Sequence, residues 1–590
     1  MAIEWDIKHC HNMLICVELT GILTIKSYVL HQLERDYIMK NFVDIALPTE
    51  SADNYYMNQT KNQVNNFIYI EQSWYEKLFE PNTYYILGPK GSGKTLYAAY
   101  MCADIRKETV SKSHTIDVGD YGKLIAMKTS NHLNFTDYMT MWKVILLQKF
   151  LLGLDATEIS FFGRAKNFKS IQETISQYFG YDVTDDSFNP VTVIDSCGKQ
   201  IEVTNYLNDQ LELTPLKGNS SGMIFKREEG NKSASSTNKS VERVAATYTD
   251  TWLRAIDAFR KTISKISFKF NHYLFIDGLD VRPQSINEVE YAECIGALVR
   301  AVFDLNTKIF GNIEKRDNHS FKIIALTRTD IFLNSELVNV TSCINDNCVE
   351  LDWTYSNEKE FYYSNLYKMM NRVLGWDGKN QSLPAEQYFK FSMSPKGKRA
   401  IKADLYIQRY SRLRPRDIVV YLRLLQRECK AKGVKNPDKE ILGSPEVISR
   451  YANYYTDQVK SEMMFSYSSD IVKSTFELLK ALDRDSFPVS YFEKIFDLHC
   501  ENNASFSAAF SNYRDLINVL YSLDVIGWTE RVNPRLNGNW HYRNTHWHYR
   551  EVKAIDETYR FPWEQFSIAD KPRLVVHRGA TKHILGFAKV

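Results

Sequence analysis

The segment GPKGSGKT, residues 88–95, constrains the fold more than any other part of the chain. It fits the spacing G-x-x-x-x-G-K-[ST], in which glycines allow consecutive backbone N–H groups to point at phosphate oxygens. An apolar run at residues 82–87 precedes it, and apolar residues at helical spacing follow it. This order predicts a strand, a phosphate-binding loop (P-loop) and a helix whose N-terminus adds positive potential.

The same spacing assigns roles to the two residues that end the motif. Lys94 is expected to reach the β- and γ-phosphates, and the Thr95 hydroxyl to join the shell of a Mg²⁺ ion. We therefore predict ATP and Mg²⁺ as ligands, although the motif does not distinguish ATP from GTP. The predicted nucleotide-binding residues of the loop are Gly88, Pro89, Lys90, Gly91, Ser92, Gly93, Lys94 and Thr95.

A second candidate for the metal site lies in the segment HYLFIDGLD, residues 272–280. Asp277 ends an apolar strand, where a carboxylate is needed to hold Mg²⁺, and it is the predicted Walker B aspartate. The alternative is an ordinary strand end whose Asp caps a turn. Hydrolytic P-loop ATPases usually place Glu next, but here Gly278 follows, so Asp280 is the substitute candidate for orienting water.

This D-G-L-D string resembles the Walker B segment of NACHT and other STAND nucleotidases. The next apolar strand, FKIIALTRTD, ends in Thr327 and Arg328, which resembles the STAND version of a sensor. The resemblance implies that Arg328 hydrogen-bonds the γ-phosphate and reports its presence. A structural salt bridge is the alternative role for this arginine.

Farther along, the segment RLRPRDIVVYLRLLQ opens a helix after Pro415. A Pro-Arg pair at the start of a lid helix resembles sensor 2 of AAA+ proteins, with Arg416 as the best match and Arg414 in reserve. A plain basic helix start remains an equal interpretation, because helices often begin at proline. The resemblance to STAND and AAA+ ATPases covers residues from about 60 to 440.

Alternating strands and helices predict an α/β fold, a P-loop NTPase with a doubly wound parallel sheet, a helical lid and a C-terminal winged-helix-like domain. Main helices are expected at 135–152, 247–265 and 289–310. Shorter elements are a helix at 171–179, a hairpin at 191–194 and 200–203, and a mobile polar loop at 231–241. The predicted sheet strands are 82–87, 123–127, 273–276, 321–326 and 348–351.

A chain of 590 residues is too long for one core, so several domains are expected. Met39 offers a second plausible start within the first segment. Near the C-terminus an amphipathic helix leads into a strand, and Trp547–Glu551 is a plausible returning strand, which resembles a winged helix. The predicted domains are an N-terminal extension at 1–58, an ATPase domain at 59–355 with an insertion at about 153–243, a helical lid at 356–444, and the winged-helix-like domain at 445–590.

The balance of acidic and basic residues indicates whether the protein could bind a polyanion such as DNA. The chain has 74 Lys or Arg and 71 Asp or Glu, so the whole molecule is not built to attract a polyanion. Locally, Lys396–Lys435 has 13 basic residues against three acids and could track the phosphates of DNA, as could the C-terminal domain. A solvated helix face is the commoner explanation. A protein partner or a homo-oligomer is also expected.

Cysteine and hydropathy patterns favour a soluble cytoplasmic protein. The nine cysteines include no Cys-x-x-Cys pair, as in reduced thiols. The groups His9–His11 and His541–His548 lack a full set of zinc ligands. The apolar stretch Met13–Leu30 is interrupted by Glu18 and Lys26, so no membrane partner is expected.

The expected function is an ATP-dependent switch that binds ATP, hydrolyses it slowly and alters partner binding. Its resemblance to STAND and AAA+ ATPases implies a prokaryotic regulatory, mobile-element or antiviral defence setting. Two alternatives stay open. The first is an AAA+-like loader or remodeller of nucleic acid, which DNA-stimulated hydrolysis would reveal. The second is a small-molecule kinase, which transfer of the γ-phosphate to a metabolite would reveal.

Overall fold

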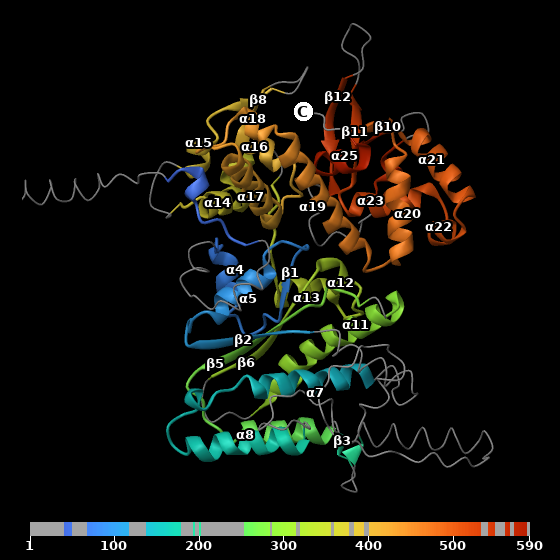
Figure 1. The fold of residues 1–590 in the computed structure, drawn as a ribbon. Coiled ribbons are helices and arrows are strands. Elements are labelled where there is room, and N and C mark those ends of the chain that lie inside the picture. Colours follow the sequence, from blue (N-terminus) through green and yellow to red (C-terminus); the bar gives the residue numbers. More distant parts are fainter. Residues whose placement is uncertain are drawn as a thin grey trace, which may run out of the picture.

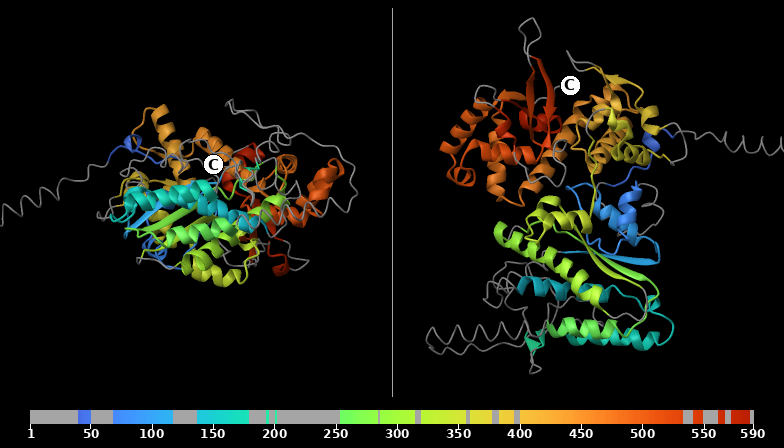
Figure 2. Two further views of the ribbon diagram at one scale, coloured as in Figure 1. Left: turned by 90° about the horizontal axis from the view of Figure 1, so that it is seen from below. Right: turned by 180° about the vertical axis from the view of Figure 1, so that it is seen from behind.

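A computed structural model of the protein has two lobes (Figure 1). The first lobe contains the described residues between 68 and 355, and the second contains those from 359 onward together with 40–49. Figure 2 shows the same arrangement from behind. The structure describes residues 40–49, 68–116, 137–178, 193–194, 200–201, 253–283, 286–313, 319–355, 359–376, 383–394, 400–532, 541–548, 561–566 and 572–586.

A five-stranded parallel sheet forms the centre of the first lobe. Its strand order is β2-β5-β6-β1-β7, and every neighbouring pair is parallel. All seven residues of β6 are buried, which is typical of a parallel sheet covered on both faces. The strands are β1 (Tyr85–Leu87), β2 (Thr109–Thr115), β5 (Asn271–Asp277), β6 (Phe321–Thr327) and β7 (Cys348–Glu350).

Helices cover both faces of this sheet because successive side chains of each strand point to opposite sides. On β5, Leu274 and Ile276 belong to the apolar cluster formed with α7 (Asp137–Leu152) and α11 (Glu288–Asp304). Tyr273 and Phe275, which alternate with them, belong to the cluster on the other face. That second cluster is completed by α4 (Gln72–Lys77) and α5 (Lys94–Cys102). The sheet is therefore an α/β layer structure, as predicted.

The edge strand β2 was not predicted from the sequence. Its segment TVSKSHT is polar, and only Thr109 and Ser111 are buried in it, so the apolar alternation that reveals a strand is weak. It nevertheless pairs with β5 over seven residues. The strand predicted at 123–127 lies outside the described residues, as does the loop at 231–241.

The remaining elements of the first lobe surround this layer structure. The predicted hairpin is present as an antiparallel pair, β3 and β4. Residues 253–263 are helical, and a π-helical turn and a 3₁₀ turn follow α11 at Leu305–Ile309 and Phe310–Asn312. The other elements are η2 (Ala156–Glu158), α8 (Arg164–Tyr178), β3 (Val193–Ile194), β4 (Gln200–Ile201), α12 (Thr329–Leu333) and α13 (Val340–Asn347).

A helical region at residues 359–444 begins the second lobe. Residues from the segment predicted as an N-terminal extension pack against it. Phe42 is fully buried, and Gln426 Nε2 donates to the carbonyl oxygen of Phe42 at 3.0 Å. The region and this segment contain η1 (Phe42–Asp44), η5 (Glu360–Tyr363), α14 (Asn365–Val373), α15 (Pro384–Tyr388), β8 (Ser392–Met393), β9 (Ile401–Lys402), α16 (Ala403–Gln408), α17 (Pro415–Ala431) and α18 (Lys439–Leu442).

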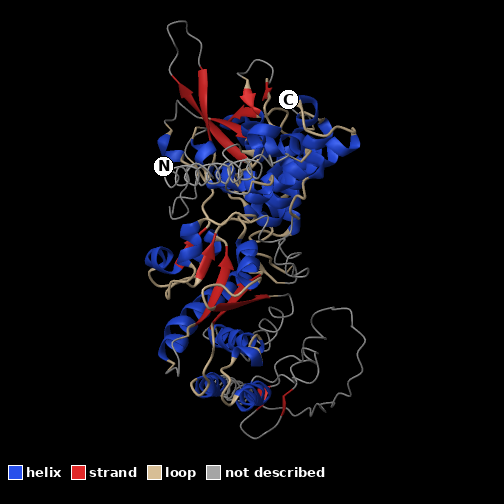
Figure 3. Cartoon of the chain, turned by 90° about the vertical axis from the view of Figure 1, so that its left-hand side faces the viewer, coloured by secondary structure: helices blue, strands red, loops and turns tan. Residues whose placement is uncertain are grey.

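The C-terminal region, from residue 445, carries a small antiparallel sheet of order β10-β13-β11-β12 at the far end of the molecule (Figure 3). Its returning strand is β12, so the prediction of that strand at Trp547–Glu551 was placed too late in the chain. The elements are α19 (Pro445–Met463), α20 (Ser469–Lys480), β10 (Ser486–Pro488), α21 (Val489–Glu501), α22 (Ala504–Ala509), α23 (Tyr513–Ser522), β11 (Ile526–Val532), β12 (His541–His546), η6 (Trp563–Gln565), β13 (Arg573–Val576) and α25 (Arg578–Leu585).

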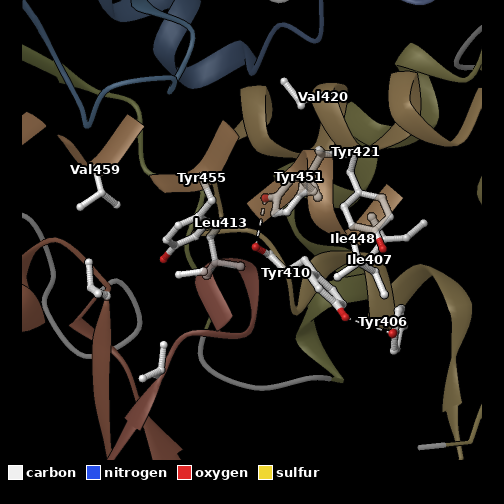
Figure 4. Packing of buried hydrophobic residues seen from close by; sticks show 14 of the residues in the cluster. Tyr406, Ile407, Tyr410, Leu413, Val420, Tyr421, Ile448, Tyr451, Tyr455 and Val459 are labelled. Atoms are coloured by element: carbon white, nitrogen blue, oxygen red, sulfur yellow. Dashed lines mark hydrogen bonds between the residues drawn. The ribbon is translucent and has the colours of Figure 1, made fainter. Parts of the chain in front are cut away.

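One apolar cluster extends through the helical region and the C-terminal region. Tyrosines from α16, α17 and α19 meet in it, as Figure 4 shows. The Tyr451 hydroxyl donates to the carbonyl oxygen of Tyr410 at 3.0 Å, and the Tyr406 and Tyr410 hydroxyls lie 3.1 Å apart. The continuous cluster couples the two predicted C-terminal domains through α19. In the part of the chain that the structure describes, no helix combines the length and apolar character needed to cross a membrane.

Candidate functional site

The glycine-rich loop, residues 88–95, connects the end of β1 to the start of α5. Gly91 and Gly93 have φ values of +86° and +99°, a left-handed conformation that favours glycine. A Cβ atom on Gly91 would also lie 3.2 Å from the Cβ of Arg416. The loop conformation and the close approach of α17 therefore both depend on this glycine.

Lys94 lies folded back over the loop. Its Nζ donates to the carbonyl oxygens of Gly88 at 2.9 Å and Pro89 at 3.1 Å. Burial lowers the pKa of Lys94, while the nearby carboxylates of Asp280 and Asp277 raise it. The ammonium group is therefore held against the backbone of the loop.

Thr95 and Asp277 are 182 residues apart in sequence and are in direct contact. The Thr95 hydroxyl donates to Asp277 Oδ2 at 2.5 Å, and the Gly278 amide donates to Asp277 Oδ1 at 2.8 Å. Burial raises the pKa of Asp277, and these two hydrogen bonds lower it; burial is the larger effect. The pair places a hydroxyl and a carboxylate side by side at the carboxyl ends of β1 and β5.

The turn after Asp277 explains why no glutamate follows it. Gly278 has a φ of +84°, and a Cβ there would lie 2.7 Å from the carbonyl oxygen of Ile116. A side chain at this position is therefore excluded by the end of β2. Burial lowers the pKa of Lys90 and of Lys94, and the carboxylate of Asp280 lies close enough to both lysines to oppose that shift.

Arg328 follows β6 and is only 8% exposed. Its Nε donates to Asp330 Oδ1 at 2.9 Å, and its Nη2 contacts the other carboxylate oxygen, so the structural salt bridge is present. The guanidinium also lies 5.3 Å from the centre of the Phe465 ring. Among the described residues, no group accepts a hydrogen bond from its buried Nη1. Arg328 thus retains a donor for an additional anion.

Both arginines predicted at the start of the lid helix contact the loop. The backbone N–H of Arg416 donates to the carbonyl oxygen of Gly91 at 3.3 Å. Arg414 Nη1 donates to the carbonyl oxygen of Lys90 at 3.2 Å and to Glu462 Oε1 at 2.6 Å. Arg414 therefore donates a side-chain hydrogen bond to the loop, while the side chain of Arg416, the preferred prediction, lies against Gly91.

Three residues that the sequence did not single out lie at or beside the loop. Lys90 Nζ donates to Ser461 Oγ at 2.6 Å, and Trp353 Nε1 donates to the carbonyl oxygen of Ser92 at 2.9 Å. Glu462 lies beside these groups, at the end of α19. No local pattern marks Ser461 or Glu462, whereas Trp353 could have been noticed because it follows the predicted strand at 348–351.

The basic run at Lys396–Lys435 is not a uniform charged surface. Arg412 and Arg414 are buried and both pair with Glu462, at 3.0 and 2.6 Å. The charges of Arg412 and Arg414 are therefore paired inside the protein and do not contribute to a basic surface. Residues 395–399 lie outside the described chain.

The donor set at the loop fits a polyanion with a divalent cation. Ser92 Oγ and Arg328 Nη1 are both buried, with no hydrogen-bond partner within the described residues. Thr95 and Asp277 supply oxygen ligands, which suit Mg²⁺. In the described part of the chain, at the loop or elsewhere, no group of three or more His, Cys, Asp or Glu residues could hold a metal ion.

No protein-family model, curated protein or solved structure matches the chain. The six cysteines in the described ranges are all free thiols: Cys102, Cys294, Cys343, Cys348, Cys429 and Cys500.

Proposed function

We propose that the protein binds ATP with Mg²⁺ in the loop at residues 88–95, hydrolyses it slowly and acts as a nucleotide-dependent switch. The contact between Thr95 Oγ1 and Asp277 Oδ2, at 2.5 Å, carries this proposal. In P-loop ATPases a loop Ser or Thr and a Walker B Asp hold the Mg²⁺ ion. Here the corresponding residues meet beside Lys94, at the carboxyl edge of a parallel sheet, where ligands of such sheets bind.

The loop residues have distinct tasks in this proposal. Backbone N–H groups of the loop and the N-terminus of α5 hold the phosphates, because the first N–H groups of a helix have no intrahelical acceptor. Lys94 exchanges the carbonyl oxygens of Gly88 and Pro89 for phosphate oxygens. When bound, Mg²⁺ neutralises negative charge on the β- and γ-phosphates. Arg328 uses its unpaired Nη1 to hold the γ-phosphate.

Slow hydrolysis is supported by the turn at Gly278. The position that usually carries the water-orienting glutamate is closed by the carbonyl oxygen of Ile116. Asp280 takes over this task from two residues farther on, with poorer positioning. We expect turnover well below the median enzyme rate of about 10 per second.

The finer fold assignments belong to the same proposal. The parallel sheet is a doubly wound P-loop domain, and the helical region is its lid. In the C-terminal region the order α20, β10, α21, α23, β11, β12 supports a winged-helix-like domain. One departure is that β13, from the end of the chain, lies between β10 and β11.

Replacing Lys94 with alanine tests the assignment of the site. Loss of a charge-assisted hydrogen bond of about 1.5–3 kcal/mol should weaken Mg²⁺–ATP binding about 10- to 150-fold in calorimetry. Lys169→Ala is the matched control, because Lys169 is 75% exposed and pairs only loosely with Glu173 at 3.8 Å. Wild-type affinity in Lys94→Ala would show that the loop is not the nucleotide site.

Scattering and single-turnover hydrolysis test the switch itself. Small-angle scattering should differ between the protein with a non-hydrolysable ATP analogue and the protein with ADP. Hydrolysis in a single turnover should be slow. Rapid hydrolysis with identical scattering in both states would contradict the switch.

A further inference from the structure

The segment Ser461–Tyr467, at the end of α19, contacts the glycine-rich loop and the loop that follows β5. Lys90 Nζ donates to Ser461 Oγ at 2.6 Å. After β5, Arg282 Nε donates to the carbonyl oxygen of Met464 at 3.0 Å, and Arg282 Nη2 donates to that of Tyr467 at 3.1 Å. One short segment of the second lobe is thus bound to two parts of the candidate site.

The same segment also contacts Arg328, which follows β6, and Tyr291 of α11. Phe465 lies with its ring centre 5.4 Å from that of Tyr291 and 5.3 Å from the Arg328 guanidinium. The guanidinium of Arg328 is therefore in contact with a residue just beyond the C-terminal end of α19. In Figure 1, α19 runs from the helical region down to α12, the helix that Arg328 precedes.

Glu462 contributes a buried negative charge at this junction. It accepts from Arg412 Nη1 at 3.0 Å and from Arg414 Nη1 at 2.6 Å. Burial by itself would raise the pKa of Glu462, but the guanidinium groups of Arg412, Arg414 and Arg328 bring it well below its usual range. Glu462 is therefore ionised at neutral pH, and its charge balances the arginines nearest the loop.

We propose that Glu462 and the segment Ser461–Tyr467 determine how the site distinguishes a nucleoside triphosphate from a diphosphate, because the γ-phosphate competes with Glu462 for the hydrogen bond of Arg414 and for the longer-range attraction of Arg328, whose own hydrogen bonds go to Asp330. This inference rests on the proposed function and adds its regulatory element. With a diphosphate, Glu462 remains the counter-ion and the segment stays against the loop. With a triphosphate, the arginines turn to the γ-phosphate and Glu462, now with fewer cations around it, leaves.

The departure of Glu462 from the site is transmitted to the rest of the second lobe because α19 is one continuous helix of 19 residues. It packs against α17 of the helical region and against α25 of the C-terminal region. Gly579 of α25 is so close that an added Cβ would lie 2.6 Å from the ring of Tyr455. A displacement at Ser461 therefore moves the C-terminal region with it. A ligand shifts such an equilibrium only through contacts that differ between the two states, which Glu462 and the γ-phosphate supply.

Glu462→Gln is the direct test, because it removes the charge and keeps the shape. We expect the affinity for a non-hydrolysable ATP analogue to rise by about tenfold, as removal of about 1.4 kcal/mol of competition predicts, with ADP affinity unchanged. Amide hydrogen exchange of residues 461–467 should be faster with the analogue than with ADP in the wild type, and fast in both states in Glu462→Gln. Glu446→Gln is the matched control, since Glu446 lies on the same helix, 55% exposed, and pairs only with Arg450 within α19.

The outcomes separate this inference from the proposed function. If Glu462→Gln binds both nucleotides like the wild type and exchange at 461–467 is the same in both states, the inference is wrong while the nucleotide site stands. If the wild type binds no nucleotide, the proposed function itself fails. If Glu462→Gln does not fold, Ser461→Ala decides, because it removes only the hydrogen bond to Lys90 that holds the docked segment. Exchange at 461–467 with ADP should then become faster and approach the rate with the ATP analogue; unchanged exchange with ADP overturns the inference.

Discussion

Substitution of Asp277 by asparagine tests two effects of its buried charge separately: the effect on the stability of the fold and the effect on binding at the metal site. Asp277 accepts hydrogen bonds from Thr95 at 2.5 Å and from Gly278 at 2.8 Å. Asparagine has the same shape, can accept from Gly278 through its oxygen and can donate to the Thr95 hydroxyl. The substitution therefore removes the charge with little change in packing.

The expected effects on stability and on binding have opposite signs. Because burial raises the pKa of Asp277, the folded protein binds a proton at this site more readily than the unfolded chain. The free energy of unfolding therefore falls as the pH rises from the pKa of the unfolded chain, about 3.9, through the pKa of Asp277 in the folded protein. At pH 7 the ionised carboxylate thus destabilises the folded state. Asp277→Asn should be more stable than the wild type at pH 7. It should bind Mg²⁺–ATP about 10- to 150-fold more weakly, from loss of about 1.5–3 kcal/mol.

Two measurements check this pair of effects. Urea unfolding without nucleotide, at pH 7 and near pH 4, should show a gain in stability that disappears at the lower pH. Calorimetry with ATP, in Mg²⁺ and in a chelator, should show that only the Mg²⁺-dependent part of the affinity is lost. Asp257→Asn is the control, because Asp257 is 57% exposed and pairs with Lys261 on its own helix. Wild-type magnesium dependence in Asp277→Asn would refute the metal assignment, and a loss of stability at pH 7 would refute the electrostatic argument.

Three other substitutions test single features of the site. Arg328→Ala should retain ADP affinity and lose preference for ATP, because only ATP offers a γ-phosphate to Nη1; equal losses in calorimetry would make Arg328 structural. Asp280→Asn should lower single-turnover hydrolysis while ATP affinity stays unchanged, and an unaltered rate would remove Asp280 from the proposed task. Burial and Asp352 raise the pKa of Glu350 to about 7, so wild-type stability should fall as pH rises from about 4.3 to 7. Urea unfolding of Glu350→Gln should lack that fall, and an identical pH profile would contradict the assigned burial.

Local features of the chain were predictable from the sequence. The loop at 88–95 and its flanking strand and helix are confirmed as a strand, a turn with left-handed glycines and α5, because this unit depends on consecutive residues. Strand β5 was predicted at 273–276 because these four consecutive residues are apolar. Strand β2 was missed because its buried positions, Thr109 and Ser111, are polar residues at the edge of the sheet.

Contacts between distant residues depended on the tertiary structure. Thr95 contacts Asp277 because β1 and β5 are parallel strands of one sheet, so that their carboxyl ends lie at the same end of the sheet. The sequence placed Arg416 and Arg414 near each other, but only the packing of α17 on Gly91 determines which one reaches Lys90. Ser461 and Glu462 carry no local signal, because their position depends on the length and direction of α19 across the second lobe. A motif is defined by neighbours along the chain, whereas a contact between lobes, such as that of Lys90 with Ser461, forms only where separate cores bring its members together.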